Sequence, residues 1–151
     1  MTGAARARLP EAIFGLIVLL LVQFTLGIAT NLFVTIPLHH SGSQPGDYFT
    51  GSVSSIGWAI GSGGVLLAAH AILGIGLVLS SVRALVLAIR VRERRLLVAT
   101  AAGGFFILGA AGNGASFLDY QHNVSSMIMA SLFALAMLSY VLVLFWAPRQ
   151  T

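Results

Sequence analysis

Four long apolar stretches restrict this sequence more than any other feature. They cover approximately residues 10–37, 62–90, 96–118 and 122–147. Each is long enough to cross the bilayer as a helix, because about 20 residues span the roughly 30 Å hydrocarbon core. Charged residues make up only 8% of the chain, against about 25% in typical soluble domains. The sequence therefore predicts an all-α integral membrane four-helix bundle, a single transmembrane domain with an outer loop over residues 38–61.

The arginines predict the orientation of this bundle. All eight basic residues are arginines, and seven of them lie at the ends of apolar stretches: Arg6, Arg8, Arg90, Arg92, Arg94, Arg95 and Arg149. In a chain that crosses four times, these seven fall on one side of the membrane. Because cytoplasmic loops carry the excess of positive charge, both termini are expected on the cytoplasmic side of the cell membrane. Nucleic acid is not an expected partner, since the arginines follow topology and do not gather on one polar face.

The eighth arginine has two interpretations. Arg83 lies within the second apolar stretch, seven residues before Arg90. Its side chain can extend to the cytoplasmic surface while its stem stays in the membrane. Alternatively, it points inward as the counter-charge of a bound acidic group.

A short motif occurs twice and predicts a tandem repeat. The pattern L-G-x-A-x-N spans residues 26–31 and again 108–113. Each copy is followed by an outer loop and then by a helix with a histidine in its outer part, first His70 and then His122. This order is typical of two helix hairpins in tandem, an arrangement that sets the second and fourth helices facing each other across the bundle.

His70 is the main candidate for a functional group. It lies about two turns inside the second apolar stretch, where a polar side chain must find an internal partner. In one interpretation it is a neutral imidazole bonded to Asn31, Asn113 or Gln23. In the other it is an axial haem ligand, because imidazole is a common ligand of haem iron and helical bundles hold such cofactors between facing helices.

The fourth helix offers two partners for His70. His122 at its start either caps the helix or ligates iron. Met129 shares a helical stripe with His122, Ser125 and Ser126. Counted from the nearest cytoplasmic arginines, His122 and His70 differ in depth by about 10 Å, so Met129 is the alternative residue to oppose His70.

The outer loop suggests a different metal site. His39 and His40, together with His122 and with Asp47 or Asp119, form a candidate copper or zinc site, since imidazole suits both ions. The chain has no cysteine, which excludes thiolate zinc sites and iron–sulfur clusters. No hydrolase motif occurs, and whether the protein is an enzyme stays open.

A family resemblance follows from several short motifs. These are Gln23-Phe24-Thr25-Leu26-Gly27, then His70, then Leu108-Gly109-Ala110, and finally His122. Together they resemble one four-helix half of the heme A synthase family, whose halves carry haem-ligand histidines on the second and fourth helices. The resemblance implies that His70 and His122 ligate a b-type haem near the outer face. It does not carry over the family's oxidation of haem, because Leu67 and Ala71 stand where the family usually has a glutamate and an arginine.

The predicted function is therefore that of an integral membrane haem b-binding protein in electron transfer or haem handling near the outer face. Its expected partners are the lipid bilayer and a redox partner or quinone. The candidate cofactor contacts are His70, His122, Met129, Asn31, Asn113 and Arg83. Two alternatives stay open: a non-catalytic membrane subunit or scaffold with structural histidines, and an outer-face copper or zinc protein that uses His39 and His40.

Overall fold

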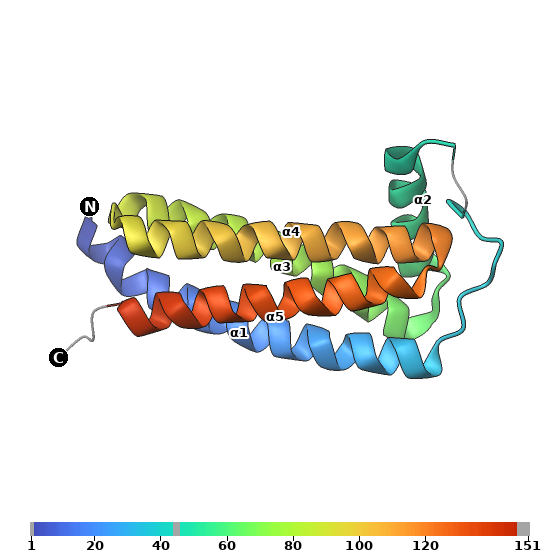
Figure 1. The fold of residues 1–151 in the computed structure, drawn as a ribbon, viewed down its shortest axis with the longest axis horizontal. Helices are drawn as coiled ribbons and strands as arrows, with labels where there is room; N and C mark the ends of the chain where they lie inside the picture. Colours follow the sequence, from blue (N-terminus) through green and yellow to red (C-terminus); the bar gives the residue numbers. More distant parts are fainter. Residues whose placement is uncertain (1, 44–45, 148–151) are drawn as a thin grey trace.

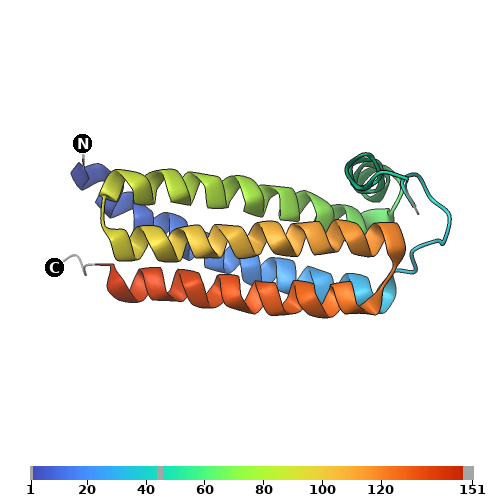
Figure 2. The same cartoon turned by 45° about the horizontal axis from the view of Figure 1, so that its top comes forward.

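The computed structural model describes residues 2–43 and 46–147, and these form helices connected by short segments (Figure 1). The five helices are α1 (Thr2–Phe33), α2 (Tyr48–Gly61), α3 (Gly64–Val91), α4 (Arg94–Tyr120) and α5 (Asn123–Trp146). The described residues contain no strand. The four longer helices run lengthwise in one bundle, and α2 lies across one end of it (Figures 1 and 2).

The four long helices are each long and apolar enough to cross a membrane. Much of their apolar surface faces outward, including Phe14, Leu79, Phe105 and Leu138, all more than half exposed. In water such a surface would be strongly unfavourable, whereas lipid chains match it. The predicted all-α architecture with four membrane-spanning-length helices is confirmed, and it indicates a multi-pass membrane protein.

The helices form a ring in which α1 and α4 each pack against both α3 and α5. Helices α3 and α5 are therefore diagonal to each other across the bundle. The first turn of α1, the α3–α4 turn and the end of α5 meet at one end (Figure 1). Arg6 lies at that end and forms an ion pair with Glu93, with 3.1 Å between Nη2 and Oε2. We call this the arginine end; Arg149, which was predicted to belong to it, is outside the described residues.

The outer loop predicted for residues 38–61 contains a helix, α2, that the sequence analysis did not predict. The segment is rich in Ser and Gly, a composition typical of loops. Asp47 nevertheless caps its first turn, because its carboxylate accepts a hydrogen bond from the Thr50 N–H at 2.8 Å. That bond holds the pKa of Asp47 below its usual range. Burial of Ala59 against Leu67 and Leu118 fixes the other end of the helix to the bundle.

The first helix is displaced from its predicted bounds of 10–37. It begins at Thr2, runs through Pro10 and ends at Phe33, before Pro37. A proline inside a helix removes the hydrogen bond of its own nitrogen, and its ring crowds the carbonyl of the residue four positions earlier, so packing must offset this cost. Leu9 and Ile13, on either side of Pro10, are almost completely buried in the core. This packing stabilises helical structure around Pro10, where the local sequence alone predicts that the helix begins.

The half of the bundle nearer the arginine end is closely packed. Tyr140 is fully buried there, and its ring lies against Gly103 of α4. A Cβ added to Gly103 would lie 2.6 Å from the Tyr140 Cζ atom. Helices α4 and α5 can therefore approach at this level only because residue 103 has no side chain. Leucine, isoleucine and alanine side chains fill the space around this contact.

Candidate functional site

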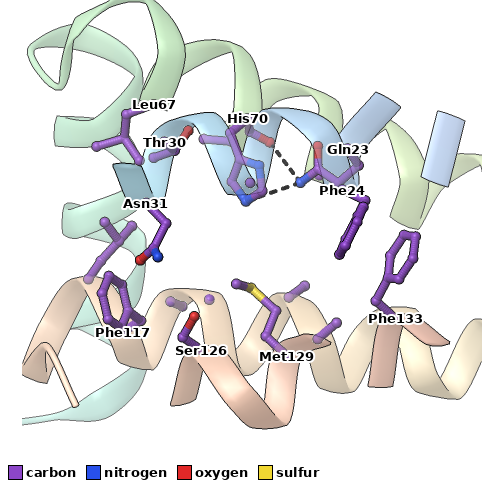
Figure 3. Close-up of a pocket in the computed structure, with 18 of the residues that line it drawn as sticks. Gln23, Phe24, Thr30, Asn31, Leu67, His70, Phe117, Ser126, Met129 and Phe133 are labelled. Carbon is purple, nitrogen blue, oxygen red and sulfur yellow. Dashed lines mark hydrogen bonds between the residues drawn. The ribbon is translucent and has the colours of Figure 1, made fainter. Parts of the chain in front are cut away.

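The other half of the bundle contains a cavity of about 620 Å³ (Figure 3). Its walls come from all four long helices, and its outer end is bounded by residues 34–36 and by Ile56 of α2. Most of the lining is apolar, and much of it is small: Gly27, Ala71, Gly74, Ala110, Gly114 and Ala130. Small side chains facing inward leave the space that larger side chains fill nearer the arginine end.

His70 extends from α3 toward α1 and meets Gln23 (Figure 3). The Gln23 Nε2 atom lies 3.3 Å from the His70 Nε2 atom and donates to the His70 carbonyl oxygen at 3.1 Å. A carbonyl oxygen can only accept, so the second contact fixes which end of the Gln23 amide faces His70. The imidazole Nε2 atom then accepts the other amide hydrogen, and the proton of the neutral ring lies on Nδ1.

Two glycines make this contact possible. A Cβ on Gly27 would lie 3.1 Å from the His70 Cε1 atom, and a Cβ on Gly74 would lie 3.3 Å from the Gln23 Nε2 atom. Both distances are tighter than ordinary van der Waals contact. Close approach of α1 and α3 at Gly27 and Gly74 therefore brings the amide against the imidazole.

Three buried polar atoms in the cavity lining have no hydrogen-bond partner among the described residues. They are the His70 Nδ1, Gln23 Oε1 and Thr30 Oγ1 atoms. Leaving a buried donor or acceptor unpaired costs about 1–3 kcal/mol, and such groups in native proteins usually meet a ligand, an ion or water. The cavity therefore presents both a donor and acceptors to whatever enters it.

Met129 approaches the same cavity from α5, the helix diagonal to α3. Figure 3 shows the Met129 thioether and the His70 ring directed toward the space between these helices. Gly114 of α4 lies beside the sulfur, where an added Cβ would make ordinary van der Waals contact with Sδ at 3.4 Å. Deeper in the cavity Phe24 and Phe133 stack, with 5.0 Å between ring centroids.

The structure brings together some of the predicted cofactor contacts and separates others. His70, Met129 and Asn31 all line the cavity. His122 does not, because α4 continues to Tyr120 and leaves His122 exposed at the N-cap of α5. Asn113 donates to the Gly109 carbonyl within its own helix at 3.0 Å, and Arg83 is exposed on α3 outside the cavity lining.

Several lining residues were not predicted as cofactor contacts from the sequence. Gln23 appeared there only as a hydrogen-bond partner of His70, and Thr30, Phe24 and Phe133 did not appear as contacts. One signal was available, because Gln23, Gly27 and Thr30 are spaced four and three residues apart and so share one face of α1. A polar stripe on an otherwise apolar membrane helix indicates an internal face.

The predicted copper or zinc site receives no support. Within residues 2–43 and 46–147, no group of three or more His, Cys, Asp and Glu side chains is placed to hold a metal ion. His39 is exposed. Both ring nitrogens of His40 face backbone carbonyl oxygens, and Asp119 accepts a hydrogen bond from Ser52 at 3.1 Å.

The chain matches no protein-family model, and comparisons with curated proteins and with solved structures return no significant match. The resemblance to a heme A synthase half therefore stays a prediction from short motifs. Fold and site together define a helical membrane protein of the multi-pass class with an internal, mostly apolar cavity. The most reactive groups in the lining of that cavity are an imidazole and a thioether.

Proposed function

We propose that this protein binds haem b in the cavity, with His70 and Met129 as the iron ligands, and serves electron transfer or haem handling. One observation carries the proposal: an imidazole and a thioether line the same cavity from diagonally placed helices. His and Met are an established pair of haem ligands. In the proposed orientation the arginine end is cytoplasmic, so the cavity lies toward the outer face of the cell membrane.

The residues present fit such a group in size and chemistry. The volume of about 620 Å³ falls within the roughly 300–1,000 Å³ of cofactor sites. Glycine and alanine walls leave room for a flat ring system. Asn31 and Thr35 line the cavity as well, and their polar side chains suit the carboxylates of a haem, whereas the Gln121 amide already donates to the Pro37 carbonyl at 3.0 Å. A bound haem would supply one-electron chemistry, and the chain would supply the ligands and exclude water.

Iron ligation through the His70 Nε2 atom requires one rearrangement. Its lone pair accepts from the Gln23 amide in the described structure, so this hydrogen bond must break. The second bond, from the Gln23 Nε2 atom to the His70 carbonyl, is independent of the ring lone pair and can remain. Gln23 therefore competes with iron for the ring, and His70 is held in place until a ligand arrives.

The absorption spectrum of the purified protein tests this function. Protein made in haem-replete cells and extracted into mild detergent is expected to be red, with a Soret band that shifts on reduction and one haem per chain. Folded protein that is colourless, and that remains colourless when titrated with haemin, would contradict the proposal. That result would leave the description of the helical bundle unchanged, and His70 would have a role other than haem ligation.

The second candidate function is a non-catalytic membrane subunit or lipid-binding scaffold. The observation that favours it is the Gln23–His70 hydrogen bond, which partners the imidazole Nε2 atom without any metal. In this function His70 and Gln23 join α1 to α3, and the cavity holds a lipid chain.

The substitution Gln23→Leu distinguishes the two functions. If His70 ligates iron through Nε2, this variant is expected to bind haemin at least as tightly as wild type, because the amide no longer competes for the lone pair. If the pair is only structural, the variant stays colourless and loses about 1 kcal/mol of stability. Haemin titration and thermal unfolding in detergent measure both quantities. Thr25→Val, on the exposed side of α1, is the matched control. Complete loss of haem from Gln23→Leu would contradict ligation through Nε2.

A further inference from the structure

Some residues that line the cavity are also exposed on the outside of the bundle. Ile28 and Leu32 of α1 both line the cavity, and they are 46% and 67% exposed. A side chain that is exposed and also lines the cavity marks a place where the cavity opens to its surroundings. Most of these residues belong to α1 or α5, and the full set is Phe24, Ile28, Asn31, Leu32, Thr35, Ile75, Ala111 and Ala130.

The exposed part of the lining on α1 is turned toward α5. Phe24 of α1 stacks on Phe133 of α5, and Figure 3 shows the two rings facing each other at one end of the cavity. Ile28 and Leu32 follow Phe24 by four and eight residues, so they share its face of the helix. Ala130 precedes Phe133 by three residues on α5. An opening that we call the lateral slot therefore lies between α1 and α5, bordered by these five residues.

The depth of the lateral slot corresponds to one leaflet of the membrane. It extends from Phe24 to the end of α1 at Phe33, which is about 14 Å at 1.5 Å per residue. The hydrocarbon core of a bilayer is roughly 30 Å thick. In the proposed orientation the slot faces the lipid chains of the outer leaflet. Asn31 and Thr35, which are polar, lie at its outer rim, near the level of the lipid headgroups.

Helices α1 and α5 are weakly connected along the slot. Gln23 joins α1 to α3 through its contacts with His70. Among the side chains that the structure describes, no hydrogen bond joins α1 to α5. Nearer the arginine end, Leu16 and Leu20 of α1 share one buried core with Tyr140 of α5. The two helices are therefore held together below the phenylalanine stack, and beyond it they can separate without breaking a hydrogen bond.

The outer end of the cavity is a more costly route. Helix α2 and the segment after α1 cover it, and both are bonded to residues at the end of α4. The Tyr48 hydroxyl donates to the Gly112 carbonyl at 2.9 Å, and the Gln121 amide donates to the Pro37 carbonyl at 3.0 Å. Ala59 of α2 is also fully buried in an apolar cluster with residues of α3 and α4. Opening this end would break these hydrogen bonds and expose the cluster.

We infer that the cavity is loaded sideways from the membrane, through the lateral slot between α1 and α5. Its ligand is then an apolar or amphipathic molecule dissolved in the bilayer, not a solute of the aqueous phase. An apolar ligand matches the slot border, and its polar groups can pair inside with the His70 Nδ1 and Thr30 Oγ1 atoms, which have no partner among the described residues. Naming haem as this molecule rests on the proposed function, whereas the route does not.

The absence of cysteine makes a labelling experiment direct. Ala115→Cys introduces one thiol on the buried cavity wall of α4, the helix diagonal to α1. The measured quantity is the rate at which N-cyclohexylmaleimide, which dissolves in lipid, modifies this thiol in phosphatidylcholine nanodiscs. Adding Ile28→Trp is expected to slow the reaction about tenfold, because the indole must be displaced from the slot. Val22→Trp is the matched control, since Val22 is also 46% exposed on α1 but does not line the cavity. It should leave the rate unchanged.

A reagent confined to water separates the two routes. A charged methanethiosulfonate is expected to modify Gly57→Cys, at an exposed position of α2, and to leave Ala115→Cys unmodified over the same time. Equal modification of the two thiols by this reagent overturns the inference, and so does an unchanged maleimide rate in Ile28→Trp. Should Ile28→Trp not fold, Leu32→Trp takes its place against the same control. The readout needs no haem, so its failure is distinct from failure of the proposed function.

Discussion

Replacing His70 with alanine is expected to abolish haem binding, seen as loss of the Soret band from purified protein and at least a hundredfold weaker affinity in haemin titration. An iron–imidazole bond has no substitute in this part of the chain, because the other cavity-lining groups are amides, hydroxyls, apolar side chains and one thioether. A hundredfold loss corresponds to about 2.7 kcal/mol. His122→Ala is the matched control, since His122 is exposed and does not line the cavity.

A third variant assigns the second ligand. Met129→Leu preserves the volume of the side chain but removes the sulfur, so it is expected to keep haem and to change the spectrum of the reduced protein and its reduction potential. If His122→Ala loses haem and Met129→Leu does not change the spectrum, then the pair implied by the family resemblance is correct. The cavity would in that case have to rearrange at the α4–α5 turn.

The second large effect is expected for Gly103→Leu, which should prevent native packing of α4 on α5. Any Cβ at this position would lie 2.6 Å from the ring of Tyr140, which is fully buried and cannot move aside. Overpacking a core by a few methyl groups typically costs about 1–3 kcal/mol, and a leucine against a trapped aromatic ring should exceed that range. Thermal unfolding in detergent, followed by circular dichroism, measures the loss.

Two controls test whether the loss of stability comes from the close approach of α4 to α5 at Gly103. Gly15→Leu introduces the same side chain on α1 at a site with no neighbour within 4 Å of the added Cβ, and it should leave the unfolding temperature nearly unchanged. The double substitution of Gly103→Ala with Tyr140→Leu removes the ring and should recover part of the stability lost in Gly103→Ala alone. Equal unfolding temperatures for Gly103→Leu and Gly15→Leu would show that α4 and α5 do not meet at this level.

The apolar stretches predicted the four long helices because hydrophobic length is a property of local sequence. The same local information misplaced the start of α1 at Pro10, since burial of Leu9 and Ile13 in the core depends on partners far along the chain. It also missed α2, whose Ser- and Gly-rich sequence becomes helical where Ala59 packs on Leu67 and Leu118.

The candidate site shows the same limit. His70 could be selected from sequence alone, because an imidazole within an apolar helix needs an internal partner. The position of His122 could not, since it depends on α4 continuing to Tyr120 and on the turn that follows. The cavity could not be predicted from the sequence either. It arises from glycine and alanine residues on several helices, and the rotation of these helices relative to one another is determined only by their packing. Of the two repeated asparagines, Asn31 lines the cavity and Asn113 bonds within its own helix.

One half of the bundle is closely packed and the other contains the cavity, and this difference limits which movements of a solute through the protein are possible. Leu20, Leu77, Ile107 and Ala136 line the bottom of the open half, and beneath them Tyr140 and its neighbours leave no continuation toward the arginines. The compartment is blind-ended. Passage of a solute from it to the arginine end would require the helices to separate, whereas Ile28 and Leu32 in its lining are 46% and 67% exposed, so its upper part communicates sideways with the lipid beside α1.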